Sequence, residues 1–348
     1  MSDLPARSVS ADDLRPASPD LPPGTIAMIA GQHLNGGLMR ALTAEFSRRG
    51  EVNAVEQRSV TVRPSNGEPY EIQAVRWSLA LADSDDDYGS QLIVSLLEDA
   101  AEQLRAESGN TPASATDHNA DPDDADLTVT VLPAQLRPDP VMLLLDVDST
   151  LIDQEVIELL AAHAGRERDV AAVTERAMRG ELDFAASLHE RVATLAGLPE
   201  SVLESAGGAI TLTQGARELT RGFLRRDWPV HVVSGGFSQV LAPLADELGL
   251  SGYRANDLGI VQHQLDGTVV GAVVDRAAKK EYLAEHSARH GLGPDNVVAV
   301  GDGANDLDMV RAAGVGVAFC AKPALAAKAD LVISHRSLEL VGLALGLD

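Results

Sequence analysis

The pattern of apolar residues divides the chain into two parts. In the first part, apolar residues alternate or form short runs in some segments and recur every three or four positions in others. The former pattern indicates strands and the latter indicates helices. Together they predict strands over 25–31, 53–63, 73–82 and 127–132 and helices over 36–49 and 89–105. This order of elements predicts a ferredoxin-like α+β domain over residues 24–135.

Beyond residue 140, uninterrupted runs of β-branched residues and leucine replace the alternating pattern. They predict strands over 141–145, 230–233, 297–300, 315–318 and 331–334. Strands of this composition are buried on both faces, as in a parallel sheet that helices cover on each side. We therefore expect an α/β domain over 141–348, built on a Rossmann-like, doubly wound parallel sheet.

Two segments of this second part do not fit the sheet pattern. Residues 153–223 are helical in pattern and too long for a single crossover, so we expect an inserted helical cap. Residues 253–274 contain the sequence LDGTVVGAVV, in which Asp266-Gly267 predicts a two-residue hairpin turn. We expect both segments to lie outside the sheet.

Composition narrows the class of protein. A formal net charge of −24 argues against nucleic-acid partners and against anionic membrane surfaces. A single cysteine excludes an internal disulfide framework. No apolar run is long enough for a signal peptide or a membrane span. We expect a cytoplasmic protein with a disordered tail over 1–23 and an acidic linker over 108–126.

Four carboxylates follow strands of the predicted parallel sheet. Asp146 and Asp148 come after its first strand, and Asp302 and Asp306 come after the strand over 297–300. Carboxyl ends of parallel strands meet at one edge of a sheet, where ligands bind. Adjacent carboxylates repel one another and need a metal or a shared proton. Because only oxygen ligands are present, we expect Mg²⁺ rather than zinc.

Groups that bind phosphate lie beside these carboxylates in the predicted sheet. Ser234 offers a hydroxyl, Gly235 and Gly236 offer backbone N–H groups before a helix, and Lys279 or Lys280 offers a cation. Carboxylates, Mg²⁺ and anion donors together favour phosphoryl transfer. In that reaction the first aspartate of DVDST attacks phosphorus, and the second acts as general acid and base.

The motifs DVDST, SGG and GDGAND, with a lysine between the last two, resemble those of haloacid dehalogenase phosphatases. A wider pattern is similar to the phosphoserine phosphatases of that superfamily, across essentially all of 141–348. It comprises DVDSTLIDQEVIELLA, AMRGELDFAASLHERV, VVSGGF and VAVGDGANDLDMV. The resemblance implies hydrolysis of O-phospho-L-serine to L-serine and phosphate through an aspartyl phosphate, the last step of serine biosynthesis.

The resemblance also implies roles for individual residues. Asp146 is the implied nucleophile and Asp148 the general acid and base, and Mg²⁺ is held by Asp146, Asp148 and Asp302, with Asp306 in support. Opposite charges for the substrate's ammonium and carboxylate come from Glu155 and Arg191. The full set of implied substrate-binding residues is Glu155, Met178, Phe184, Arg191, Ser234, Gly235, Lys279 and Asn305.

The N-terminal domain resembles ACT-type regulatory domains, which bind amino acids. The family's Arg-Pro-Gly turn before the first helix is replaced here by the sequence HLNGG over 33–37. Two interpretations of this domain remain open, a site for a serine effector and a sheet that serves only dimerisation. A homodimer is expected with either.

Two alternatives to phosphoserine hydrolysis remain open at this point. One is the same chemistry on another small phosphomonoester. The other is a regulatory protein that senses an amino acid through its N-terminal domain and has a catalytically silent phosphatase body. The presence of both Asp146 and Asp148 favours an active enzyme over the silent one.

Overall fold

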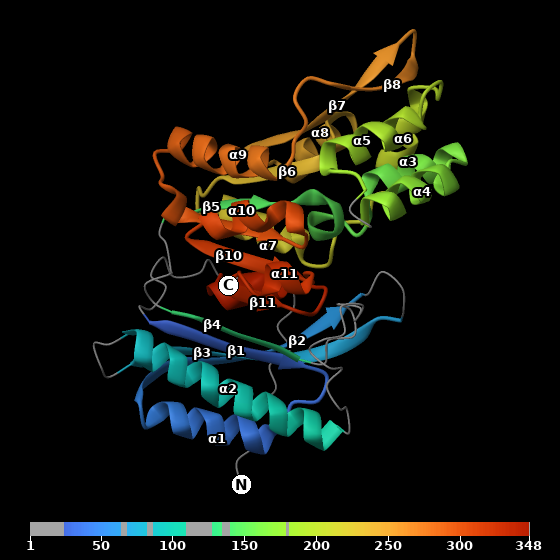
Figure 1. Cartoon of the computed structure of the whole chain (residues 1–348). Helices are drawn as coiled ribbons and strands as arrows, with labels where there is room; N and C mark the ends of the chain where they lie inside the picture. Colours follow the sequence, from blue (N-terminus) through green and yellow to red (C-terminus); the bar gives the residue numbers. More distant parts are fainter. Residues whose placement is uncertain are drawn as a thin grey trace.

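The structure is a computed structural model that describes residues 24–63, 68–81, 86–108, 127–133, 140–178 and 181–347. The expected tail over 1–23 and nearly all of the expected acidic linker over 108–126 lie outside these residues. Figure 1 shows the N-terminal unit as a sheet with two helices below it and the larger α/β unit above it.

The N-terminal unit has the predicted order of elements. Its elements are β1 (Thr25–Gly31), α1 (Gly36–Ser47), β2 (Gly50–Val62), β3 (Tyr70–Leu81), α2 (Asp86–Ser108) and β4 (Leu127–Leu132). The strands pair antiparallel in the order β2-β3-β1-β4, which confirms the ferredoxin-like α+β fold. Both helices cover one face of this sheet, where Phe46 packs edge-on against Trp77.

The other face of the N-terminal sheet is buried against the α/β unit. Every residue of β1 is buried, whereas a sheet with one solvent face would alternate between buried and exposed positions. Met28 of β1 belongs to the same apolar cluster as Leu343 of α12 (Glu339–Leu345). The Ser334 N–H also donates to the Thr128 hydroxyl of β4 at 3.0 Å. The two units therefore share one apolar core.

A seven-stranded sheet forms the centre of the α/β unit. Its strands are β5 (Met142–Leu145), β6 (Val230–Phe237), β7 (Gly252–Val261), β8 (Gln264–Val270), β9 (Val297–Gly301), β10 (Val315–Phe319) and β11 (Leu331–Ile333). They lie in the order β11-β10-β9-β5-β6-β7-β8, and only β7 and β8 pair antiparallel. The predicted Rossmann-like parallel sheet is confirmed.

Helices cover both faces of this sheet, as a doubly wound fold requires. The helices are α7 (Ala216–Leu224), α8 (Ser238–Leu248) and α12 on one face, and α9 (Arg276–Arg289), α10 (Leu307–Ala312) and α11 (Pro323–Ala326) on the other. Successive residues of β5 serve opposite faces. Leu143 and Leu145 pack in the first layer, and Met142 and Leu144 pack in the second.

A helical insertion separates β5 from β6 in the chain. It contains α3 (Val156–Ala164), α4 (Glu167–Met178), α5 (Phe184–Ala193) and α6 (Ser201–Gly208). Figure 1 shows these four helices grouped at one end of the sheet, at the right of the view. Helix α7 lies within the range expected for the cap but packs on β5 and β6 instead.

The prediction for residues 253–274 is wrong in two respects. Strand β7 pairs in parallel with β6, so the segment belongs to the sheet. The hairpin turn lies at Gln262 and His263, whose φ angles of 51° and 60° suit a two-residue type I′ turn, and Asp266-Gly267 lies inside β8. The hairpin tip contacts the cap, because the Glu200 N–H donates to the His263 oxygen at 2.9 Å. A tertiary contact therefore accompanies a turn that local propensity does not favour.

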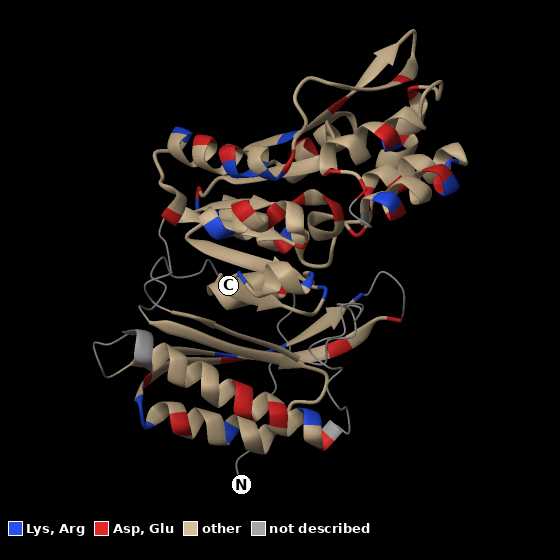
Figure 2. Cartoon of the chain, viewed as in Figure 1, with Lys and Arg blue, Asp and Glu red and all other residues tan. Residues whose placement is uncertain are grey.

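Figure 2 shows acidic and basic residues interspersed along the outer helices α4 and α9. Of the helices that the structure describes, none combines the length and the apolar character needed to cross a bilayer.

Candidate active site

The central strand β5 leads to Asp146 and Asp148 at the carboxyl end of the parallel sheet. All its residues are fully buried, and it is hydrogen-bonded to β6 on one side and β9 on the other. The Asp146 N–H continues this ladder by donating to the Val300 oxygen at 2.9 Å. Val147, between the two aspartates, is buried in the core. A strand that is fully buried thus fixes the backbone of both carboxylates.

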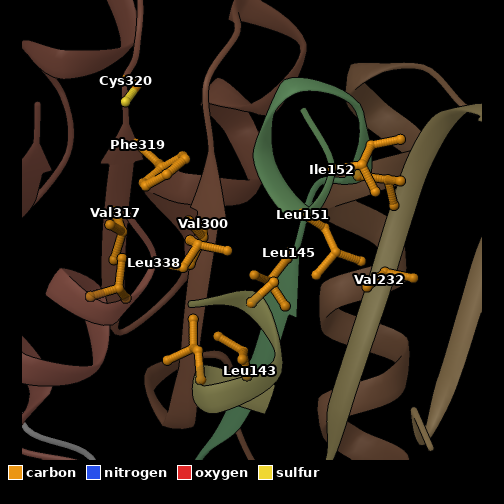
Figure 3. Close-up of a cluster of buried hydrophobic side chains, with 14 of the residues drawn as sticks. Leu143, Leu145, Leu151, Ile152, Val232, Val300, Val317, Phe319, Cys320 and Leu338 are labelled. Atoms are coloured by element: carbon orange, nitrogen blue, oxygen red, sulfur yellow. The ribbon is translucent and has the colours of Figure 1, made fainter. Parts of the chain in front are cut away.

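A tight turn, Val147–Leu151, follows the strand. The Ile152 N–H donates to the Val147 oxygen at 3.0 Å, and Ser149 has a left-handed φ of 55°. Leu151 and Ile152 then return to the apolar cluster shown in Figure 3. The turn leaves Asp148 and Ser149 partly exposed at the carboxyl end of the sheet, whereas Thr150 is fully buried and apolar residues anchor the turn from below.

Lys279 joins two of the strand ends. Its ammonium lies 2.6 Å from Asp146 Oδ1 and 2.7 Å from Asp306 Oδ1, and the side chain is fully buried. The Val147 N–H also donates to Asp146 Oδ1 at 2.7 Å, so the orientation of this carboxylate is fixed. Lys280, the alternative in the sequence, is exposed. The structure places Lys279 among the carboxylates.

Asp146, Asp302 and Asp306 have the geometry of a cation site. Each presents one carboxylate oxygen, and these oxygens lie within 4.8 Å of one another. Burial, followed by the charge of Asp306, raises the pKa of Asp146 well above its ordinary value, and burial raises that of Asp302 to about 7. Three carboxylates face one lysine, so a hard divalent cation fits both the oxygen donors and the excess negative charge.

Asp148 is held separately from this group. Its Oδ1 accepts from the Val156 N–H at 2.8 Å, and its Oδ2 accepts from the Ser234 hydroxyl at 2.9 Å. Burial raises the pKa of Asp148, although these two hydrogen bonds act in the opposite direction. A buried carboxyl with a raised pKa is suited to donate and accept a proton.

The loop after β6 packs tightly against Asp148. A Cβ atom at Gly236 would lie 2.9 Å from Asp148 Oδ2 and 3.0 Å from the Ser234 hydroxyl. At Gly235 it would lie 2.9 Å from the ring of Phe184. A side chain at Gly236 would therefore displace Asp148 or Ser234, and Gly235 leaves space for a ring from the cap.

The cap contributes groups of opposite charge. Glu155 precedes α3 and accepts from the Ser149 hydroxyl at 3.0 Å; burial, together with the charges of Asp148 and Asp302, raises its pKa to about 7. Burial lowers the pKa of Arg191 on α5, while Glu155 and Asp148 act in the opposite direction. Within the described residues, Arg191 has no carboxylate at ion-pair distance, and its Nε donates to the Ser187 oxygen at 3.3 Å.

Two other residues were expected at the site, Asn305 and Met178. Asn305 is half-buried in the short turn after β9, and its Oδ1 lies where a Cβ at Gly303 would be 2.3 Å away. Met178 ends α4, and its side chain lies outside the described residues.

Two polar residues support the site but were not predicted from the sequence, Asn256 and Arg336. Asn256 is buried and donates to the Gly235 oxygen at 2.8 Å while accepting from the Val274 N–H at 2.7 Å. Arg336 is buried and contacts the turn after β5. Both bind backbone of distant segments, which leaves no motif in the sequence.

Comparisons with known proteins agree with this geometry. Residues 143–311 match the family described as haloacid dehalogenase-like hydrolase. The chain is 51% identical over 205 residues to phosphoserine phosphatase SerB2 of Mycobacterium tuberculosis, covering 59% of this chain and 50% of that protein. It is 46% identical over 200 residues to a phosphoserine phosphatase of Streptococcus thermophilus, covering 58% of this chain and 93% of that protein. The match thus spans about half the length of the mycobacterial relative but nearly all of the streptococcal one.

Two solved structures extend the comparison. A substrate-bound phosphoserine phosphatase complex is 41% identical and has a TM-score of 0.55, covering 58% of this chain and 96% of its own. A probable phosphoserine phosphatase from Vibrio cholerae is 29% identical and has a TM-score of 0.65, covering 92% of this chain and 86% of its own. By these matches, the chain belongs to the haloacid dehalogenase-like hydrolases, in the family of the phosphoserine phosphatases.

Proposed function

We propose that this protein is a Mg²⁺-dependent phosphatase that hydrolyses O-phospho-L-serine to L-serine and phosphate. The observation that carries the proposal is the meeting of Asp146 and Asp148, at the end of β5, with cap residues of opposite charge, Glu155 and Arg191. The names of the relatives point to the same substrate.

Metal binding is assigned to the acidic group at the strand ends. Asp146, Asp302 and the backbone carbonyl of Asp148 would hold the ion, and Asp306 would support it while it also binds Lys279 and the Gly303 N–H. When bound, Mg²⁺ offsets the negative charge that carboxylates and phosphate bring together.

Two steps, each with its own bond changes, complete the reaction. In the first, an Asp146 oxygen attacks phosphorus, the bond between phosphorus and the serine oxygen breaks, and Asp148 gives its proton to that oxygen. In the second, Asp148 takes a proton from water, the water oxygen attacks phosphorus, and the bond to Asp146 breaks. Lys279 and the Ser234–Gly235 loop would bind the phosphoryl oxygens in both steps.

Substrate choice is assigned to Glu155 and Arg191. Glu155 would bind the ammonium of phosphoserine, and Arg191 would bind its carboxylate through two N–H groups. Phe184, which lies over Gly235, would close the site from the cap side together with Met178. A charge pair that matches an amino-acid zwitterion favours phosphoserine over an arbitrary phosphomonoester.

Truncated substrates test these assignments separately. O-phosphoethanolamine lacks the carboxylate, and 3-phosphooxypropanoate lacks the ammonium. A charge-assisted hydrogen bond is worth about 1.5–3 kcal/mol, so Arg191→Gln should raise KM for phosphoserine roughly 10- to 100-fold and leave KM for O-phosphoethanolamine nearly unchanged. Glu155→Gln should also raise KM for phosphoserine, but it should leave KM for 3-phosphooxypropanoate nearly unchanged.

Any of three results would contradict these assignments. An equal effect of Arg191→Gln on both substrates would remove Arg191 from carboxylate recognition. A wild-type enzyme that prefers either analogue to phosphoserine would favour the alternative of another small phosphomonoester. Absence of any phosphate release with Mg²⁺ present would favour the catalytically silent sensor.

For the N-terminal unit we propose a serine effector site and a homodimer. A hollow of about 530 Å³ is lined by Gln32, His33, Asn35 and Glu107 at the turn before α1. Strand β2 lies at the edge of its sheet, which leaves one long strand edge for a second copy. Calorimetric titration with L-serine and sedimentation of the full chain test the two parts. No heat of binding, or a monomer at all concentrations, would contradict them.

A further inference from the structure

Arg336 lies between β11 and α12, far from the catalytic motifs in sequence, yet it contacts the turn that follows β5. It is 7% exposed. Its Nε donates to Asp153 Oδ1 at 3.0 Å, and its terminal nitrogens donate to the backbone oxygens of Ser149 at 3.3 Å, Ile152 at 3.4 Å and Asp153 at 3.3 Å. One buried guanidinium therefore satisfies four acceptors of a single five-residue segment, Ser149–Asp153.

This segment needs external support for its conformation. Ser149 has a left-handed φ of 55°, which residues other than glycine rarely adopt. Buried backbone oxygens also need hydrogen-bond donors. The segment receives donors from Arg336 on one side, and on the other it pairs with the 211–213 segment through an Asp153 N–H to Thr211 oxygen bond of 2.9 Å. A fixed fork of N–H groups suits several acceptors at once.

The segment reaches the substrate site through Glu155. The Ser149 hydroxyl donates to Glu155 Oε1 at 3.0 Å, so the position of Ser149 sets that of the carboxylate. The catalytic carboxylates have anchors of their own, because Asp146 is held by Lys279 and Asp148 by Ser234. Loss of Arg336 should therefore disturb substrate binding more than the chemical steps.

The residues beside Arg336 contact the N-terminal sheet. The Ser334 N–H donates to the Thr128 hydroxyl at 3.0 Å, and His335 Nδ1 lies 3.4 Å from the Tyr70 hydroxyl. Leu338, two residues later, is fully buried in the cluster of Figure 3. The backbone that carries Arg336 is thus positioned from both units.

We propose that Arg336 is a positioning residue for substrate binding: it holds the Ser149–Asp153 segment that places Glu155, and the N-terminal sheet holds Arg336 in turn. The proposal deepens the proposed function and rests on it for the identity of the ammonium substrate. It makes the contact between Thr128 of the N-terminal sheet and Ser334, two residues before Arg336, a determinant of substrate affinity.

Kinetics of Arg336→Gln test the first half. We expect KM for O-phospho-L-serine to rise about tenfold with kcat within about threefold, and KM for 3-phosphooxypropanoate, which has no ammonium, to stay unchanged. The matched control is Arg76→Gln. Arg76 is 6% exposed and contacts Glu56 at 3.1 Å and the Leu343 oxygen at 3.4 Å, so its loss removes a buried arginine without touching the catalytic turn. If Arg336→Gln changes KM equally for both substrates, as the Arg76→Gln control does, Arg336 has only a structural role.

Hydrogen exchange of the free protein gives a readout that needs no substrate. Arg336→Gln should speed exchange of the amides of 149–155, and Arg76→Gln should not. Unchanged exchange in Arg336→Gln overturns the inference, whereas a wild-type enzyme that fails to hydrolyse phosphoserine overturns only the proposed function. If Arg336→Gln does not fold, Asp153→Asn, which weakens the same contact, is read by the same criteria.

Thr128→Val tests the link to the N-terminal sheet. This nearly isosteric change removes the acceptor of the Ser334 N–H. We expect Thr128→Val to raise KM for phosphoserine less than Arg336→Gln does, and to speed amide exchange over 149–155. In the double variant, Thr128→Val should have less effect than it has in the wild-type background. Wild-type exchange and KM in Thr128→Val, or full additivity in the double variant, would overturn the link.

Discussion

Gly236 shows at the scale of one residue how closely the proposed general acid is packed. An added Cβ would lie 2.9 Å from Asp148 Oδ2 and 3.0 Å from the Ser234 hydroxyl, so one of these groups must move. A displacement of about 1 Å in an active site can cost on the order of 100-fold in rate. We therefore predict that kcat of Gly236→Ala, measured by steady-state phosphate release, falls on the order of 100-fold.

Gly207→Ala is the matched control for this change. Gly207 lies in helix α6, and an added Cβ there would meet nothing within 4 Å. Alanine favours helix over glycine by up to about 1 kcal/mol, so this variant should keep full activity and equal or greater stability. A Gly236→Ala enzyme as active as the control would contradict the close packing of Asp148.

Sequence predicts site residues at strand ends better than it predicts those that act from elsewhere. Asp146, Asp148 and Asp302 follow buried strands, and parallel strands end at a common edge, so their convergence follows from the pattern. The choice between Lys279 and Lys280 depends on the rotation of α9 about its axis, which neighbouring positions do not reveal. Arg336 binds backbone oxygens, which carry no side-chain signature.

At the scale of elements, the contact between β6 and α9 contains three histidines, of which His231 is buried, His286 half-buried and His290 exposed. His231 is 2% exposed; its Nδ1 lies 3.0 Å from the Tyr282 hydroxyl and its Nε2 lies 2.8 Å from His290 Nε2. The His286 ring stacks on Tyr282. Burial, with smaller effects of His286 and His290, lowers the pKa of His231 to about 3. His286 and His290 are one turn apart on α9, a spacing that can be read from the sequence, whereas His231 comes from β6, 55 and 59 residues earlier in the chain.

This low pKa predicts a dependence of stability on pH. Between about pH 3 and 6.5 the unfolded chain binds a proton at His231 that the folded chain does not, so the free energy of unfolding falls as pH decreases, by up to about 1.4 kcal/mol per pH unit from this group. His231→Phe should lose stability at pH 7.5 and show a shallower decline from pH 7.5 to 5.5 in urea unfolding.

The difference between variant and wild type is the quantity to compare. Buried carboxyls such as Glu155, whose pKa is raised to about 7, act in the opposite sense, because they take up protons in the folded state first. These groups are common to both proteins and cancel in the difference. Parallel stability curves for the two proteins would contradict a neutral, buried His231.

Strand and helix positions follow from the sequence where the pattern is long. The β5, β9 and β10 strands match continuous apolar runs to within a residue or two. The β7–β8 hairpin does not, since its turn at Gln262 and His263 has no favoured turn residue and contacts the cap at Glu200. Contact between distant segments overrides local preference there.

At the scale of the whole molecule, the two units share an apolar core. Met28 of the N-terminal sheet and Leu343 of α12 belong to one cluster that extends to the centre of the parallel sheet. The signal for this packing was present in TIAMIAG, which is apolar on both faces of the strand. A sandwich standing alone needs only one apolar face, but which partner covers the second face cannot be derived from the strand itself.

The shared core predicts that both units unfold in one transition. The chain has two tryptophans, and Trp77 lies in the N-terminal unit while Trp228 lies in the α/β unit. In single-tryptophan variants, Trp77→Phe and Trp228→Phe, fluorescence should give coincident urea midpoints. Leu343→Ala, which deletes a buried side chain at a cost of about 2–5 kcal/mol, should shift both midpoints together. Different urea midpoints for the two tryptophans, with Leu343→Ala shifting only the midpoint reported by Trp77, would contradict a common core.

The central claim is that Asp146 forms the covalent intermediate in phosphoserine hydrolysis. The most direct test is to measure phosphate release from O-phospho-L-serine by Asp146→Asn and by the wild-type protein, both with Mg²⁺ present. We predict a loss of at least about 1,000-fold with the far-ultraviolet circular dichroism unchanged, because an amide is a poor nucleophile. Turnover within about tenfold of wild type would contradict the account.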